Sequence, residues 1–395
     1  MLKVVKDGQV YAPWYMGKKD LLIIEDKIGA LVDNINLSSL TNNEVFEVEI
    51  IEARNKLVVP GFIDGHVHIA GGGGEGGFKT RTPEIQFFEI VGGGITTVVG
   101  CLGTDGITRE VKGLYAKAKS LEAEGLSTYI YTGSYHVPPS TITGKIQDDL
   151  VFVDNVIGVG EIAISDHRSS HPTVKELIKI ASAARLGGIL SGKKAVIHFH
   201  LGTGKENLLY IENIIEKSEL PLEQFYPTHL NRSSELFENA IRYAKRGGYI
   251  DLTTTTAKAF LKQGEIKASK GLKELIKAGV SKENITFSSD GQGSLPEYDK
   301  NGTLTGLSIG KVKSLHREVR DAVLEEGLLL CHVLPVVTQN PAKILGLSNK
   351  GCLSRDMDGD VLVLDRKDLS IETVIAKGVI MYHEGKHLIA PTFGG

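Results

Sequence analysis

The chain has 395 residues, with 45 Lys and Arg against 48 Asp and Glu, and its formal net charge at pH 7 is −3. This near-balance excludes the basic surface of a nucleic-acid-binding protein, and 41% hydrophobic with 24% charged residues excludes a mainly disordered chain. The three cysteines, Cys101, Cys331 and Cys352, are widely spaced and odd in number, which favours a reducing, cytoplasmic location over a disulfide framework. No apolar run reaches the length of about 18 residues that a membrane span needs, and the N-terminal residues do not resemble a signal peptide, so we expect neither.

Both ends of the chain predict short β-strands separated by turn residues. The N-terminal runs are residues 4–5, 10–11, 20–25, 28–31 and 45–51, and the C-terminal runs are 360–364, 373–375 and 379–381. Because chain ends are often close in space and one domain can be inserted into another, we predict that residues 1–55 and 348–395 form one small β-sandwich domain.

The middle of the chain, residues 56–347, predicts parallel βα units, since short apolar runs alternate with helical patterns at residues 173–190, 205–217, 233–246 and 272–278. The apolar runs are residues 57–63, 96–100, 128–132, 157–164, 195–199, 225–228, 249–253 and 285–288. Eight such units in about 290 residues match a (β/α)8 TIM barrel. The predicted class is therefore α/β with a TIM barrel, and a doubly wound open sheet is the alternative.

Histidines and carboxylates stand at the carboxyl ends of several predicted strands, where a barrel collects its catalytic groups. In chain order they are His66, His68, Glu161, His200, His229 and Asp290. A single histidine in a strand is more often a packing residue, but this ordered set predicts a metal site, because imidazole and carboxylate suit zinc and related divalent ions. His198 shares the spacing of His200 and is assigned a packing or supporting role, and the cysteines are assigned to packing.

The order His-x-His, carboxylate, His, His, Asp on a barrel resembles the amidohydrolase superfamily. Further segments resemble its isoaspartyl dipeptidase family across essentially the whole chain: residues 71–77 (GGGGEGG), 80–84, 103–105, 132–135, 163–169 (AISDHRS), 227–232 and 288–291. The resemblance implies a metallopeptidase that hydrolyses the isopeptide bond of β-aspartyl dipeptides with a metal-bridging hydroxide. It also implies two divalent metal ions, with Zn²⁺ as the first choice, although the ligands would equally accept manganese, cobalt or nickel.

The resemblance also implies individual roles. His66 and His68 would hold the more buried ion with Asp290, and His200 and His229 the second ion. Asp290 can also move a proton from the attacking water to the leaving amine. The remaining matches are Tyr135 for polarising the scissile carbonyl, Glu75 for the substrate α-amino group, and Thr104, Arg168, Arg232 and Ser294 for the substrate carboxylates.

One position departs from the family pattern. Many members place a carbamylated lysine where this chain has Glu161, which keeps the negative charge but reaches about 3–4 Å less at ~1.5 Å per bond. Either the strand end moves inward or one metal is weakened. We predict a dinuclear site that assembles without CO2; the alternative is that Glu161 only supports other ligands and one ion is held tightly.

Other functions remain open at this point. The chain could be another amidohydrolase, such as an N-acyl-D-amino-acid deacylase, a dihydroorotase or a hydantoinase, or a non-catalytic barrel. The expected partner is a small dipeptide, with no nucleic acid and no membrane, and a homo-oligomer is expected. The long polar stretch 294–306 is the best candidate for a lid over the site.

Overall fold

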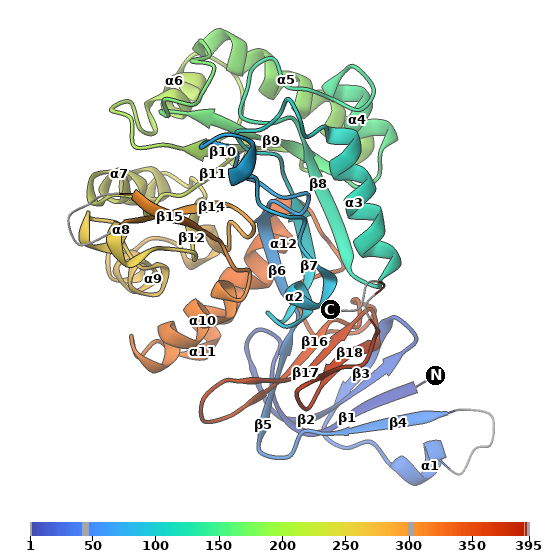
Figure 1. The fold of residues 1–395 in the computed structure, drawn as a ribbon. Coiled ribbons are helices and arrows are strands. Elements are labelled where there is room, and N and C mark those ends of the chain that lie inside the picture. The colour runs from blue at the N-terminus through green and yellow to red at the C-terminus, as the bar shows by residue number, and fades with distance from the viewer. Residues whose placement is uncertain (1, 42–46, 299–303, 391, 393–395) are drawn as a thin grey trace.

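Both ends of the chain contribute strands to one sheet in the computed structural model, which describes residues 2–41, 47–298, 304–390 and 392. The two ends meet where β16 runs antiparallel to β5, with Val361 opposite Pro60 and Asp365 opposite Lys56, so the blue and red strands lie side by side in Figure 1. The sheet order is β19-β18-β17-β16-β5-β1-β2-β3, and β4 also pairs with β1. The strands are β1 (Leu2–Tyr11), β2 (Tyr15–Ile24), β3 (Lys27–Val32), β4 (Val48–Glu52), β5 (Lys56–Pro60), β16 (Val361–Asp365), β17 (Ile371–Ala376), β18 (Val379–His383) and β19 (Lys386–His387).

Strands from the two ends pair in one sheet, while the predicted division into two domains stays a prediction. The run 57–63, predicted as a single strand, is two strands separated at Gly61: β5 belongs to the terminal sheet and β6 (Phe62–Val67) begins the next sheet. The terminal sheet thus extends past the boundary predicted between residues 55 and 56. The nine strands form one continuous hydrogen-bonded sheet, and the sandwich arrangement stays a prediction. Residues 45 and 46 of the predicted run 45–51 lie outside the described residues.

The middle of the chain forms a curled parallel sheet of six strands in the order β11-β10-β9-β8-β7-β6, with a separate parallel pair β12–β13 (Figure 1). Backbone hydrogen bonds connect the pair to both ends of the sheet: Leu230 N–H donates to Asp251 O at 3.2 Å, and Asp290 N–H donates to His66 O at 3.1 Å. The predicted α/β class is confirmed. These strands are β6, β7 (Ile95–Gly100), β8 (Ser127–Thr132), β9 (Val156–Ile164), β10 (Val196–Leu201), β11 (Phe225–Thr228), β12 (Ile250–Thr253) and β13 (Ile285–Ser288).

Helices follow most of the parallel strands, and several of them pack against strands of the parallel sheets. In α5, Thr173 caps the first turn by accepting a hydrogen bond from Glu176 N–H, and Leu177, Ala181 and Ala184 are buried at helical spacing. Among the described residues, none of the helices has the length and apolarity that crossing a membrane requires. The helices are α1 (Leu37–Thr41), α2 (Phe87–Val91), α3 (Val111–Ala123), α4 (Ile146–Phe152), α5 (Val174–Ser191), α6 (Leu209–Glu216), α7 (Ser234–Lys245), α8 (Lys258–Lys262), α9 (Ala268–Lys277), α10 (Ser314–Leu324), α11 (Leu330–Val333) and α12 (Gln339–Leu345).

The stretch predicted as a lid forms part of a hairpin. β14 (Ser294–Tyr298) pairs antiparallel with β15 (Leu304–Ile309), and Ser294 lies opposite Ile309. Residues 299–303 of the predicted lid lie outside the described residues, so the lid stays a prediction.

Candidate functional site

One carboxylate lies between four histidine rings at the carboxyl ends of the parallel strands. Glu161 Oε1 is 2.5 Å from His200 Nδ1 and 3.2 Å from His229 Nε2, while Oε2 is 3.2 Å from His66 Nε2 and 3.8 Å from His68 Nε2. All five side chains are buried. The shorter side chain of Glu161 therefore reaches both histidine pairs.

Local backbone structure explains how these side chains meet. His66 lies on β6 and His68 follows the end of that strand, and their rings are neighbours with centroids 5.3 Å apart. Gly160 precedes Glu161 at a φ of 150°, and a Cβ there would lie 2.5 Å from the His198 carbonyl oxygen. Glycine is therefore what lets β9 approach β10 closely enough to aim Glu161 at His200.

Asp290, the sixth predicted ligand, lies beside His66 and His68. It follows β13, and its Oδ1 is 3.0 Å from His68 Nε2 and 3.5 Å from His66 Nε2. Burial alone would raise the pKa of this carboxyl, but hydrogen bonding to His68 and the charge of the neighbouring imidazoles hold the pKa of Asp290 below its usual range. Burial likewise raises the pKa of Glu161, but the neighbouring His66 and His200 outweigh it and hold this pKa well below its usual range. Both carboxyls are thus anionic at neutral pH.

The donor set fits a divalent cation. His66 Nε2 and Glu161 Oε2 are buried and form no hydrogen bond with any residue that the structure describes. Buried polar atoms rarely go unpaired, because desolvating them without a partner costs free energy. Two groups of metal-compatible atoms share Glu161, namely His66, His68, Cys101 and Glu161, and Glu161, His200 and His229.

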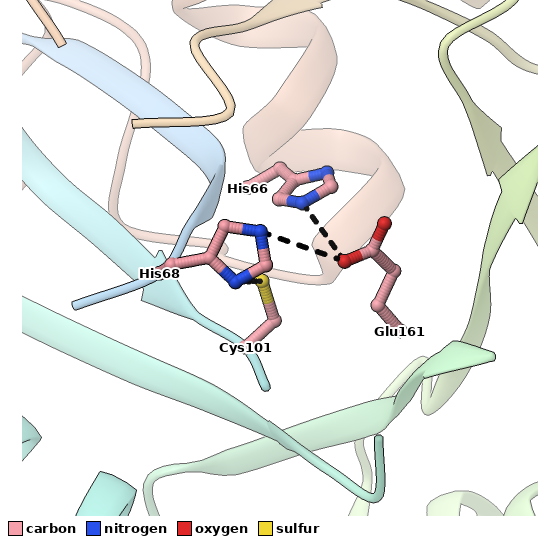
Figure 2. A group of neighbouring side chains, drawn as sticks. All are labelled: His66, His68, Cys101 and Glu161. Atoms are coloured by element: carbon pink, nitrogen blue, oxygen red, sulfur yellow. Dashed lines mark hydrogen bonds and ion pairs between the residues drawn. The ribbon is translucent and has the colours of Figure 1, made fainter. Parts of the chain in front are cut away.

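The thiol of Cys101 belongs to the first of these groups, as Figure 2 shows. Cys101 follows β7, and its Sγ lies 3.7 Å from His68 Nδ1. Burial would raise the pKa of this thiol, but His66 and His68 lower it below its usual range. The sequence assignment of Cys101 to packing missed this contact, although its position directly after a strand was the available signal.

Two of the histidines are held on their outer side by side chains that the sequence did not single out. Asp166 Oδ2 lies 3.1 Å from His200 Nε2, and Thr253 Oγ1 lies 2.6 Å from His229 Nδ1. Asp166 also binds Arg168 through both carboxylate oxygens, at 3.0 Å to Nε and 2.8 Å to Nη2. The Asp-x-Arg spacing after β9 was the sequence signal for this pairing.

Three of the residues predicted to contact substrate bind a fourth, Glu75. Its Oε1 accepts hydrogen bonds from Thr104 Oγ1 at 3.1 Å and Arg168 Nη1 at 3.3 Å, and its Oε2 accepts one from Ser294 Oγ at 3.0 Å. A cavity of about 870 Å³ opens beside this group, lined in part by Glu75, Arg168 and Ser294. A negative and a positive side chain therefore stand together at the rim of the site.

The glycine-rich loop that carries Glu75 is held by Arg109, a residue that the sequence did not indicate. The Arg109 guanidinium donates to the carbonyl oxygens of Ala70, of Gly72 at 3.3 Å and of Thr82 at 2.9 Å. These bonds join the two ends of the loop and limit where Glu75 can lie.

The last two predicted residues, Tyr135 and Arg232, lie against His200. The Tyr135 hydroxyl is 2.7 Å from His200 Nδ1, and Arg232 Nη1 is 3.0 Å from His200 Nε2. Burial raises the pKa of Tyr135 well above its usual value, so the phenol keeps its proton and can donate a hydrogen bond. All the predicted site residues thus occur in one region, next to the candidate metal ligands.

Known proteins resemble this chain at three levels. Residues 57–381 match the model of the amidohydrolase family. A crystal structure of β-aspartyl dipeptidase from Fervidobacterium islandicum AW-1, in complex with β-Asp-Leu dipeptide, is 46% identical and covers 100% of both chains with a TM-score of 0.90. A D-hydantoinase from Thermus sp. shares the fold at 15% identity, with a TM-score of 0.68 over 100% of this chain and 98% of that one.

Curated relatives include a dihydroorotase from Listeria monocytogenes (serotype 4a, strain HCC23), 27% identical over 267 residues. That match takes in 62% of this chain and 58% of the dihydroorotase, so this chain spans less than two thirds of the length of that relative.

Proposed function

The chain belongs to the amidohydrolase family, and from this premise we propose that it is a metal-dependent β-aspartyl dipeptidase. It would hydrolyse the amide bond between the β-carboxyl group of an isoaspartyl residue and the next amino acid. The observation that carries the proposal is the pairing of Glu75 with Arg168 beside the buried ligand cluster. The head of such a dipeptide carries one ammonium and one carboxylate group, and these two side chains are complementary to them.

The proposed metal centre holds two divalent ions, with Zn²⁺ as the first choice. His66, His68 and Asp290 would hold one ion, His200 and His229 the other, and Glu161 would contribute an oxygen to each. His66 Nε2 and Glu161 Oε2, which face each other at 3.2 Å without a hydrogen bond to any described residue, support this assignment. When bound, such ions lower the pKa of water toward neutrality and polarise the scissile carbonyl.

The protein groups would complete the reaction as follows. Asp290, an anion at neutral pH, takes the proton of the attacking water and returns it to the leaving amine. Tyr135, which stays protonated, donates a hydrogen bond to the carbonyl oxygen as negative charge develops there.

The remaining groups bind and orient the substrate. Glu75 binds the substrate ammonium group. Thr104, Arg168, Arg232 and Ser294 bind the two substrate carboxylates, for which the guanidinium groups offer paired N–H donors.

Several coarser features belong to the same proposal. The eight parallel strands would close into a (β/α)8 barrel over residues 56–347, and residues 1–55 and 348–395 would form the second domain. The hydrogen bonds Leu230 to Asp251 and Asp290 to His66 support closure, because they join the two-stranded pair to both ends of the six-stranded sheet. A cytoplasmic homo-oligomer acting on small dipeptides completes the proposal.

The test combines elemental analysis with a substrate panel of β-Asp-Leu, α-Asp-Leu, an N-acetyl-D-amino acid and dihydroorotate. We expect two metal ions per chain and cleavage of β-Asp-Leu alone. Hydrolysis of dihydroorotate instead would refute the proposed dipeptide substrate and favour a cyclic amide hydrolase, the activity of the curated dihydroorotase relatives. One ion with β-Asp-Leu cleavage would refute the role of Glu161 in joining two ions, and no ion would refute the proposal altogether.

A further inference from the structure

His198 belongs to neither group of metal-compatible side chains, yet it is completely buried directly beneath them. It lies on β10, between the rings of Tyr131 and Tyr226, with ring centroids 4.7 and 5.0 Å away. Its Nδ1 is 3.0 Å from the Tyr226 carbonyl oxygen, and its Nε2 is 3.1 Å from His66 Nδ1. Both ring nitrogens therefore have a partner, and one partner is a predicted metal ligand.

These two contacts determine where the protons are. A carbonyl oxygen can only accept, so His198 Nδ1 carries the hydrogen and, in the neutral ring, Nε2 is an acceptor. His66 must then donate from Nδ1, and in the neutral form of His66, the form that binds a metal ion, this leaves the lone pair on Nε2. That nitrogen is the one that faces Glu161 Oε2 at 3.2 Å, and only a nitrogen with a free lone pair can bind a metal ion.

We propose that His198 is a positioning residue that fixes the tautomer and ring orientation of His66 and thereby strengthens metal binding at the His66–His68 end of the site. This inference rests on the proposed function, since it assumes that a metal ion binds there. It goes further in giving His198 a task that packing alone does not require, because a phenylalanine would fill the space between the two tyrosines without a buried polar group to satisfy.

Two other predicted ligand histidines, His68 and His229, have weaker restraints. His68 Nδ1 faces the Cys101 thiol at 3.7 Å, and His229 Nδ1 faces the Thr253 hydroxyl at 2.6 Å. Thiols and hydroxyls rotate and can either donate or accept, so they do not dictate a tautomer. His198 differs because a backbone carbonyl determines which of its ring nitrogens carries the proton, and because its ring packs against two aromatic side chains.

Three substitutions separate hydrogen bonding from packing at this position. His198→Phe keeps an aromatic ring and removes both hydrogen bonds. In His198→Gln, the longer side chain can donate to Tyr226 O and accept from His66. In His198→Asn, the shorter side chain can still donate to Tyr226 O but does not reach His66. His316→Phe is the matched control, since His316 Nε2 also bonds a carbonyl oxygen, that of Leu369 at 2.7 Å, but away from the site.

The measurement is Zn²⁺ affinity of the metal-free full-length protein, titrated against a chelator of known affinity. Loss of an outer partner of a ligating histidine typically weakens binding 10- to 100-fold. We expect this loss at one of the two ions in His198→Phe and His198→Asn, near-normal binding in His198→Gln, and no change in His316→Phe. In ¹⁵N NMR spectra of the metal-free protein, recorded at a pH at which His66 is neutral, His66 should carry its proton on Nδ1 in wild type and should populate both tautomers in His198→Phe.

The outcomes are distinct. A folded His198→Phe protein with wild-type affinity and an unchanged His66 tautomer would overturn the inference and leave the proposed function intact. Should His198→Phe not fold, the comparison of Gln with Asn decides, and equal affinities would overturn the inference. Wild-type protein that binds no ion would instead overturn the proposed function itself, and this inference with it.

Discussion

Glu75 is the residue whose substitution tests substrate recognition most directly. It accepts three hydrogen bonds in the structure, one of them from Arg168, and its side chain is 33% exposed. A hydrogen bond to a charged group contributes about 1.5–3 kcal/mol. Because solvent screens a partly exposed carboxylate, we expect Glu75→Gln to lose about 1.5–2 kcal/mol of transition-state binding. This corresponds to a fall of about 10- to 30-fold in kcat/KM for β-Asp-Leu.

The assay pairs two substrates that differ in one group. N-succinyl-leucine is β-Asp-Leu without the α-amino group, so Glu75→Gln should change its hydrolysis little. The control variant is Glu84→Gln, which neutralises a nearby carboxylate that is 57% exposed and pairs with Lys117. Equal losses on both substrates would refute the reasoning, because Glu75 would then only hold Arg168 and its loop in place.

Three further substitutions test the centre and the fold. Glu161→Gln should lower the metal content from two ions to at most one, because Glu161 is shared by both ligand groups. The wild-type protein, reconstituted with metal, should need no bicarbonate for full activity. Stimulation of its activity by bicarbonate would contradict the assignment of Glu161 as the shared ligand. Asp290→Asn should lower kcat about 10²- to 10⁴-fold at matched metal content, and an unchanged kcat would exclude it as the proton carrier. Lys350→Met should lower the free energy of unfolding, measured by urea denaturation, by about 3–5 kcal/mol. The Lys350 side chain is 1% exposed, and its ammonium group lies 2.5 Å from Asp358 and 2.6 Å from Asp360. A loss below about 1 kcal/mol would argue against a buried ionic network there.

Much of the candidate site could be predicted from the sequence because its signals are local. The alternation of apolar runs with helical patterns predicts parallel strands, and residues that follow parallel strands meet at one edge. This reasoning was enough to select His66, His200 and Asp290 as neighbours, although they are far apart in the chain. Turn residues were a weaker guide in the terminal sheet: the runs 4–5 and 10–11, predicted as separate strands, are one strand, β1. The break at Gly61 was missed because both strands flanking it are apolar.

Contacts between strands were decided only by the tertiary structure. The sequence identified Glu161 as a departure from the lysine pattern, but its reach to both histidine pairs depends on how closely β9 approaches β10. It also left Cys101 and His198 as packing or supporting residues, since neither side chain carries a local signal of what it touches. Their partners, His68 and His66, lie at the end of β6, far away in the sequence. The proton position on an imidazole depends on the polarity of the atom opposite each nitrogen, and that is a property of the assembled fold, not of any segment of the chain.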